Sequence, residues 1–160
     1  MSAQVREAGP QDVDAILAII NHYAVRGVIL PRDRADVLKS LPHFLVADRN
    51  GTVVGIVSRH DYGAHLKEVR SLAVADTERR GGIGTLLVTG LVERLRRDFP
   101  DAKIFVLTAV PAFFTRLGFC AVEKSTLPEK IWKDCRYCAH QDNCDETALT
   151  LSNARGTMQP

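Results

Sequence analysis

Three features are missing from this sequence, and each absence excludes a class of protein. No apolar run approaches the roughly 18 residues that a membrane-spanning helix requires. The first ten residues have no apolar core and do not resemble a secretory signal peptide. The formal net charge is only +2, without the strong basic excess of most nucleic-acid-binding proteins. The sequence therefore predicts a cytoplasmic protein with neither a membrane nor a nucleic-acid partner.

Cysteine is also scarce, with four residues in the chain. In a cytoplasmic protein, cysteines are more often reduced, metal-bound or redox-active than paired in disulfides. One short segment collects four soft side chains that could hold zinc: Cys135, Cys138, His140 and Cys144. Structural zinc sites usually separate two ligand pairs more widely. A packed cluster of reduced thiols is therefore the preferred interpretation over a metal site, and zinc is the alternative.

What the sequence does contain is typical of one globular domain. It has 160 residues, of which 46% are hydrophobic and 25% charged, enough for a buried core. It has no internal repeat, low-complexity stretch or linker. We predict one domain over residues 1–151 and a polar, disordered tail over 152–160.

Hydrophobic periodicity predicts a fold of the α/β class, an α+β mixed sheet with helices. Apolar residues at helical spacing predict a helix over 13–24 with Asp12 as its N-cap. Asn50-Gly51 predicts a hairpin between strands 44–47 and 52–58. Further strands are predicted over 5–8, 68–74, 103–110, 119–123 and 146–151, and further helices over 34–41, 85–98 and 112–117. The apolar stripe of the helix over 85–98 consists of Leu86, Leu87, Leu91, Val92 and Leu95.

The turn from Arg79 to Thr85 is the sharpest local feature. It reads Arg-Arg-Gly-Gly-Ile-Gly-Thr, between a strand and an amphipathic helix. Glycines allow a ligand to approach the main chain, and the helix start adds unpaired N–H groups and a positive dipole end. These properties predict a pyrophosphate cradle. A P-loop would require a Gly-Lys-Ser/Thr sequence, and the spacing of a dinucleotide fold is different. The alternative is a turn that caps a helix and binds nothing.

The pattern R-x-x-G-x-G in this turn resembles the acetyl-CoA signature of the GNAT acetyltransferases. The Leu-Ala-Val end of the preceding strand resembles the central strand of that family, and the segment over 113–119 resembles its Leu-Gly-Phe motif. The resemblance covers residues 5–151. It implies the GNAT fold, a mixed sheet that splays at its centre and is flanked by helices, with acetyl-CoA as co-substrate. The implied cofactor-binding residues are Leu72, Ala73, Val74, Arg79, Arg80, Gly81, Gly82, Ile83, Gly84, Thr85, Phe114 and Arg116.

Within the GNAT class, the chain is most similar to the catalytic domain of N-acetylglutamate synthases. Segments 27–32, 68–74, 104–108 and 127–130 carry the likeness. No segment resembles the amino-acid-kinase domain of the long synthases, so a short, single-domain form is expected. The resemblance implies transfer of acetyl to the α-amine of an amino acid, L-glutamate first, as in arginine biosynthesis. Homodimers are common in this class.

Two residues are candidates for the proton transfers. The acceptor amine must lose a proton, and Glu68, a carboxylate entering an apolar strand, is the candidate base. A solvated strand-end carboxylate is the alternative, and His60 and His65 are alternative bases. Many GNAT enzymes use a tyrosine as acid in the Leu-Gly-Phe motif, where this chain has Phe114. Thr108 matches a hydroxyl residue of the glutamate-type synthases and is the candidate donor to the leaving sulfur.

An acidic acceptor requires cationic partners in the protein. Arg32 can form a bidentate pair with a carboxylate, and Arg70 and Lys130 are further candidates. Two alternatives remain open. The chain could acetylate another amine, such as a polyamine, an antibiotic or a protein N-terminus, or it could be a CoA-binding sensor without turnover.

Overall fold

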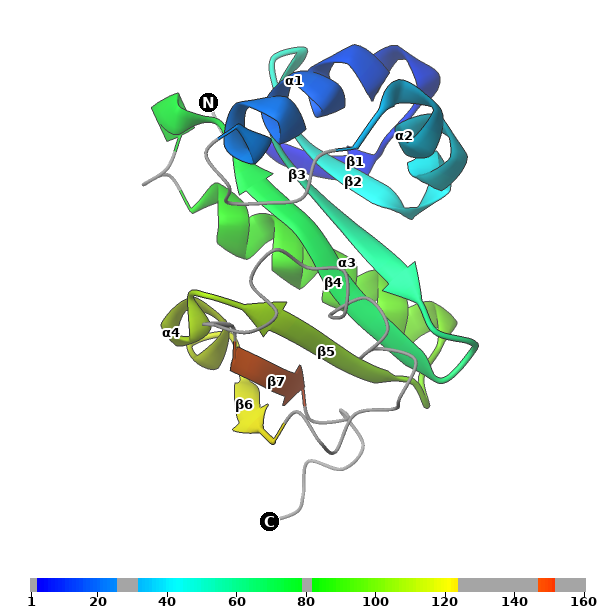
Figure 1. Cartoon of the computed structure of the whole chain (residues 1–160), viewed down its shortest axis with the longest axis vertical. Coiled ribbons are helices and arrows are strands. Elements are labelled where there is room, and N and C mark those ends of the chain that lie inside the picture. Colours follow the sequence, from blue (N-terminus) through cyan, green and yellow to red (C-terminus); the bar gives the residue numbers. More distant parts are fainter. Residues whose placement is uncertain (1–2, 26–31, 79–81, 124–146, 152–160) are drawn as a thin grey trace. The chain divides into compact units, whose positions relative to one another are not determined.

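The computed structural model describes residues 3–25, 32–78, 82–123 and 147–151 (Figure 1). The helices in this part are α1 (Val13–Ala24), α2 (Arg34–Ser40), α3 (Ile83–Asp98) and α4 (Pro111–Thr115), with 3-10 turns at η1 (Pro10–Asp12), η2 (Leu41–His43) and η3 (Asp76–Glu78). The strands are β1 (Gln4–Glu7), β2 (Phe44–Arg49), β3 (Thr52–Asp61), β4 (Leu66–Val74), β5 (Lys103–Thr108), β6 (Phe119–Val122) and β7 (Thr147–Leu151). No helix in these ranges is both long and apolar enough to span a bilayer.

The strands form a seven-stranded sheet in the order β1-β2-β3-β4-β5-β7-β6. β1 pairs with β2 and β2 with β3, both antiparallel, and β7 pairs antiparallel with β5 and with β6. The predicted fold class, a mixed sheet with helices, is confirmed. The chain divides into two compact units, which comprise the described residues of Met1–His60 with Val69–Arg97 and of Asp61–Glu68 with Asp98–Pro160.

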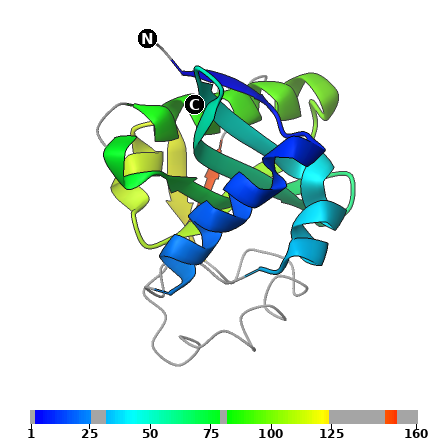
Figure 2. The same cartoon turned by 90° about the horizontal axis from the view of Figure 1, so that it is seen from above.

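In the first unit, α1 and α3 cover opposite faces of the strands (Figure 2). Alternation along β3 explains how both helices pack, because successive residues point to opposite faces. Ile56 belongs to the core beneath α1 and α2 and is fully buried. A Cβ at its neighbour Gly55 would come within 2.9 Å of Ile83 and Leu87 on α3. The absence of a side chain at Gly55 therefore allows α3 to lie close to the strand.

The β2–β3 hairpin confirms the Asn-Gly prediction. Asn50 and Gly51 both adopt positive φ, at 54° and 87°. The Gly51 N–H donates to Oδ1 of Asp48 over 2.7 Å. Two consecutive positive φ angles match the twist of the flanking strands, which is why Asn-Gly is favoured in such turns.

The second unit has a smaller aromatic core. Phe105 of β5 is fully buried and clusters with Leu66 and Ala148, and partly buried Tyr62 packs against this cluster. Near α4, the ring of Phe114 meets that of Phe119 edge-on, with centroids 5.4 Å apart.

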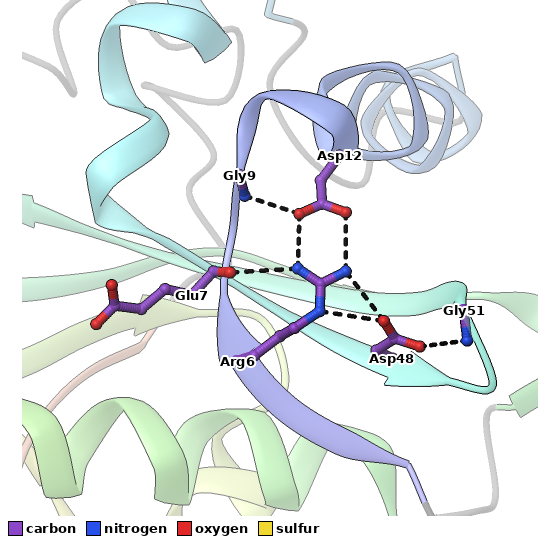
Figure 3. A network of polar contacts seen from close by, with 6 residues as sticks. All are labelled: Arg6, Glu7, Gly9, Asp12, Asp48 and Gly51. Carbon is purple, nitrogen blue, oxygen red and sulfur yellow. Dashed lines mark hydrogen bonds and ion pairs between the residues drawn. The ribbon is translucent and has the colours of Figure 1, made fainter.

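Parts of three sequence predictions are not met. Asp12 is the N-cap residue of α1, as predicted, but its side chain makes no capping hydrogen bond to that helix. Its carboxylate instead accepts hydrogen bonds from the Gly9 N–H and from Arg6 of β1, which also contacts Asp48 (Figure 3). Leu86, assigned to the apolar stripe of α3, is 43% exposed. In addition, β3 extends to Asp61 and so includes His60, which lies beyond the strand predicted over 52–58.

Candidate functional site

The end of β4 carries an irregularity just before the predicted cofactor strand. Ser71 has φ 51°, a left-handed backbone conformation that non-glycine residues rarely adopt and that costs free energy. Leu72 and Val74 follow half-buried, and Ala73 is buried. The strand therefore departs from regular extended geometry directly before the three residues expected to face the cofactor.

The described part of the glycine turn has the geometry expected of an anion cradle. Gly82 has φ 76°, and open space surrounds the position that a Cβ would occupy. Ile83 is buried and anchors the start of α3, while Gly84 is half-buried and Thr85 exposed. In the first turn of this 16-residue helix, backbone N–H groups have no intrahelical acceptor, and they lie at the positive end of the dipole. Gly82 to Thr85 thus fit a pyrophosphate; Arg79, Arg80 and Gly81 lie outside the described residues.

A pocket of about 290 Å³ adjoins the same connection in the first unit. Three polar side chains join across it. His22 Nε2 lies 2.8 Å from Asp76 Oδ2, and the Tyr23 hydroxyl lies 3.1 Å from Asp76 Oδ1 and also contacts the Val74 carbonyl. The pocket wall also includes Ala18, Ile19 and Ala75. These contacts tie the end of α1 to η3, the turn that leads into the glycine segment.

Arg32 is held by three side chains of the first unit. Its Nε donates to Asp36 over 2.7 Å, Nη2 to Ser40 over 3.1 Å and Nη1 to Ser71 over 3.3 Å. The guanidinium also lies over the Phe44 ring, 5.2 Å from its centroid. The side chain keeps 20% exposure. A guanidinium has five N–H groups, so one N–H on each terminal nitrogen remains beyond these three bonds.

Fewer contacts are described for the other two cationic candidates. Arg70 is half-buried in β4, and its carbonyl accepts a hydrogen bond from the Ser58 hydroxyl over 3.3 Å. Lys130 lies outside the described residues. So does the segment with Cys135, Cys138, His140 and Cys144, and the described ranges contain no cluster of three potential metal ligands.

Glu68 occupies a buried position in the second unit. Only 5% of its surface is exposed, so it is not the solvated strand-end carboxylate of the alternative interpretation. The Tyr62 hydroxyl donates to its Oε1 over 3.3 Å. Tyr62 is fixed by its N–H, which donates to the Leu66 carbonyl over 2.9 Å, and by its ring, 6.0 Å from that of Phe105. A carboxylate can act as a general base when it lies within hydrogen-bond reach of the proton that it accepts.

Thr108 ends β5 in the same unit and is 7% exposed. Its Oγ1 accepts a hydrogen bond from the Val110 N–H over 2.9 Å. That bond uses a lone pair and leaves the hydroxyl proton available for donation. Phe114 is 2% exposed, its ring packed edge-on against Phe113 and Phe119, whereas Arg116 is exposed at the end of α4.

The structure thus places the sequence candidates in two groups. Arg32, Arg70, the end of β4 and the start of α3 belong to the first unit, and Glu68, Thr108, Phe114 and Arg116 belong to the second. Sequence reasoning missed Tyr62 and the trio His22, Tyr23 and Asp76. No motif marks these residues, because their contacts link segments that are up to 54 residues apart.

Comparison with known proteins shows the family to which the chain belongs. Residues 40–121 match the family described as Acetyltransferase (GNAT) domain. An uncharacterized N-acetyltransferase of Chlorobaculum tepidum is 39% identical over 91% of this chain and 93% of its own length. An amino-acid acetyltransferase of Mycobacterium tuberculosis is 32% identical over 82% of this chain and 77% of its own. The N-acetylglutamate synthase of Neisseria gonorrhoeae, solved with coenzyme A and N-acetyl-glutamate, has a similar fold, with a TM-score of 0.85 at 23% identity over 97% of this chain and 36% of that protein. The chain belongs to the GNAT family of acetyltransferases.

Proposed function

We propose that the protein transfers acetyl from acetyl-CoA to the α-amine of an amino acid, with L-glutamate as the acceptor. The mycobacterial relative named amino-acid acetyltransferase supports an amino-acid acceptor. The gonococcal synthase, whose structure holds coenzyme A and N-acetyl-glutamate, supports glutamate among amino acids. The proposed setting is arginine biosynthesis in the cytoplasm, with the domain over residues 1–151 as the catalytic unit.

The buried carboxylate of Glu68 is the observation that carries the proposal. An ammonium group cannot attack a thioester until it loses a proton, and Glu68 is the proposed acceptor of that proton, directly or through water. The nitrogen then forms a bond to the acetyl carbonyl carbon, and the carbon–sulfur bond breaks. The electron pair of that bond leaves with the sulfur of CoA. The nitrogen loses its second proton as the amide forms, and this balances the proton that the sulfur takes up to become a thiol.

Thr108 is the proposed hydrogen-bond donor to the departing sulfur. A threonine hydroxyl is a poor acid, so its role is to orient the thiolate or to relay a proton from water. The Val110 N–H donates to the Thr108 oxygen and holds it in place. The proton of the Thr108 hydroxyl is then available to another acceptor. Phe114, at the position of the motif where many GNAT enzymes have a tyrosine, has no acidic proton to donate.

Acetyl-CoA supplies the activated acetyl group, and the residues to hold it are those of the glycine turn and its flanks. We assign the pyrophosphate to the backbone N–H groups of Gly82 to Thr85, with Arg79, Arg80 and Gly81 completing the turn. The backbone of Leu72, Ala73 and Val74 is assigned to the pantetheine, with Phe114 and Arg116 as further contacts.

The carboxylates of glutamate are assigned to Arg32, with Arg70 and Lys130 as further partners. The two remaining N–H groups of Arg32 sit on different terminal nitrogens, which suits an end-on two-point contact with a carboxylate. Asp36, Ser40 and Ser71 hold the guanidinium in one orientation, so little side-chain entropy is left to lose on binding.

Thiol release from acetyl-CoA tests the proposal directly. L-glutamate, L-glutamine, L-aspartate, L-lysine and spermidine are compared at equal concentrations. We expect turnover with glutamate, and we expect Arg32→Lys to raise the glutamate KM by about tenfold because lysine cannot form a two-point contact. Arg34→Ala is the matched control, since Arg34 is an exposed arginine of the same region, paired with exposed Asp14.

Each result has a defined meaning. Turnover with cationic amines only would refute the acidic acceptor and leave the acetyltransferase assignment intact. Binding of acetyl-CoA without turnover on any amine would favour the sensor. An equal rise of KM in Arg32→Lys and Arg34→Ala would refute the role of Arg32.

A further inference from the structure

We infer that Tyr62 is a positioning residue for Glu68, and this rests on the proposed role of Glu68 as the base. Neither residue type nor spacing marks Tyr62 in the sequence. In the structure its hydroxyl donates to Glu68 Oε1 over 3.3 Å. Tyr62 is the first residue of the β3–β4 connection, Glu68 is the third residue of β4, and both belong to the second unit.

The first argument is that Tyr62 is held independently of Glu68. Its N–H donates to the Leu66 carbonyl over 2.9 Å, which closes the connection between β3 and β4. Its ring packs on the buried cluster of Leu66, Phe105 and Ala148. Because the Tyr62 side chain is fixed in this way, its hydroxyl can favour one orientation of the Glu68 carboxylate. A mobile, solvated tyrosine would instead adjust to whichever orientation the carboxylate adopts.

The second argument concerns the strand on which Glu68 lies. Neighbouring Lys67 is 2% exposed. Its ammonium donates to the carbonyl of Gly63 in the connection over 3.1 Å and lies 3.4 Å from Asp61, the last residue of β3. The ammonium also lies 3.9 Å from the centroid of the Phe99 ring. Successive side chains on a strand point to opposite faces. The contacts of Lys67 therefore hold β4 from one face, and Tyr62 contacts Glu68 on the other face.

The third argument is chemical. A base must be ionised before the amine arrives, and a hydrogen bond to a carboxylate favours its ionised form. Burial of Glu68 acts in the opposite direction by removing water. The hydrogen bond from the Tyr62 hydroxyl replaces part of the hydration that the carboxylate loses on burial. It also keeps the carboxylate in one rotamer for proton transfer.

The test compares Tyr62→Phe, which removes the hydroxyl and keeps the ring, with Tyr62→Leu, which also removes the ring. In Tyr62→Phe we expect kcat/KM to fall by about tenfold at neutral pH. The acidic limb of the pH profile should move to higher pH, while the KM for acetyl-CoA stays unchanged. The melting temperature should fall by only a few degrees, roughly the effect of one lost hydrogen bond. In a Glu68→Gln background, which by itself should cost at least about 100-fold, Tyr62→Phe should have no further effect.

A second readout does not depend on turnover. The carboxyl carbon of Glu68 is observed by NMR in protein labelled with ¹³C-glutamate, and Glu68→Gln assigns its signal. Its titration midpoint should rise in Tyr62→Phe. An unchanged midpoint would overturn the inference, and so would an effect seen in Tyr62→Leu but not in Tyr62→Phe. Loss of the basic limb of the pH profile in Tyr62→Phe would also overturn it, because Tyr62 would then itself be an acid.

The proposed function fails separately. If Glu68→Gln keeps wild-type turnover, Glu68 is not the base, whatever the Tyr62 variants show. If Glu68→Gln is inactive and Tyr62→Phe matches the wild type in rate, pH profile and titration midpoint, the base stands and the role of Tyr62 falls.

Discussion

Arg6 of β1 meets Asp12 at two points, with Nη1 2.8 Å from Oδ2 and Nη2 3.0 Å from Oδ1. Asp12 is 4% exposed and also accepts the Gly9 N–H over 2.8 Å. The Arg6 side chain is 35% exposed, so the pair is only partly buried, but loss of the Asp12 charge weakens both hydrogen bonds from the guanidinium. We therefore expect Asp12→Asn to lower the free energy of unfolding by about 2 kcal/mol at pH 7, measured by urea denaturation.

The same pair gives a pH dependence of known sign. The hydrogen bond from Arg6 lowers the pKa of Asp12, although burial opposes the shift. The stabilisation is therefore complete above the pKa of the unfolded chain, about 4, and is lost as the pH falls through the lower folded value. Wild type should lose stability on acidification more steeply than Asp12→Asn. Asp14→Asn, which changes an exposed partner of Arg34, is the control and should alter stability by less than about 0.5 kcal/mol.

The elements whose conformation depends on residues close to one another in the sequence could be predicted. The helix Val13–Ala24 has the predicted bounds, because its apolar periodicity and its flanking turn are local signals. The Asn50-Gly51 hairpin was also predicted correctly, since its φ angles depend on those two residues. The glycine turn was placed between the right strand and the right helix for the same reason.

The features that depend on tertiary contacts could not be predicted. Asp12 has the sequence signature of an N-cap, but Arg6 competes for its carboxylate and is itself oriented by Asp48, 42 residues away. Leu86 has helical spacing, yet the side of α3 that contacts β3 is set by Ile83, Leu87 and the missing side chain of Gly55. The Tyr62–Glu68 contact likewise forms only when the chain folds back between β3 and β4.

Gly55 is expected to link strand packing to cofactor affinity. A Cβ there would lie 2.9 Å from Ile83 Cγ2, 2.9 Å from Leu87 Cδ1 and 3.4 Å from the Ala73 carbonyl. Gly55→Ala should lower stability by about 1–3 kcal/mol through overpacking and should displace the start of α3. We therefore expect weaker binding of coenzyme A, measured by isothermal titration calorimetry.

Gly51→Ala provides the matched control in the adjoining hairpin. No atom lies within 4 Å of a Cβ at Gly51, and only its φ of 87° opposes a side chain. This variant should lose about 1 kcal/mol of stability and keep the affinity for coenzyme A. Equal affinities in the two alanine variants would refute the link through α3.

Asp76 is expected to position the glycine turn. His22 and Tyr23 contact its carboxylate at 2.8 and 3.1 Å, and Asp76 begins η3 (Asp76–Glu78), which precedes the glycine turn in the sequence. Because the His22–Asp76 pair is about 40% exposed, its contribution is small. Asp76→Asn should raise the KM for acetyl-CoA by about threefold and leave kcat unchanged. Glu93→Gln, an exposed position of α3, is the control; a fall in kcat with an unchanged KM would contradict the prediction.

Thr108 offers a separate test of the leaving-group step. Thr108→Val keeps the β-branched shape that suits a strand and removes the hydroxyl, whereas Thr108→Ser keeps the hydroxyl. If the hydroxyl supports departure of the sulfur, Thr108→Val should lower kcat by about tenfold while the KM for glutamate stays constant. Thr108→Ser should remain within about twofold of wild type. The measurement is steady-state thiol release at saturating acetyl-CoA.

Stability must be followed in parallel, because the Thr108 oxygen also accepts the Val110 N–H. Loss of that bond in Thr108→Val should cost about 1 kcal/mol of stability, which alone does not change kcat in a folded enzyme. Thr52→Val, at an exposed position of β3, controls for the exchange of threonine for valine. If Thr108→Val keeps the wild-type kcat although its stability falls, the hydroxyl serves only to hold the turn after β5, and the donor to the sulfur must be sought in another residue or in water.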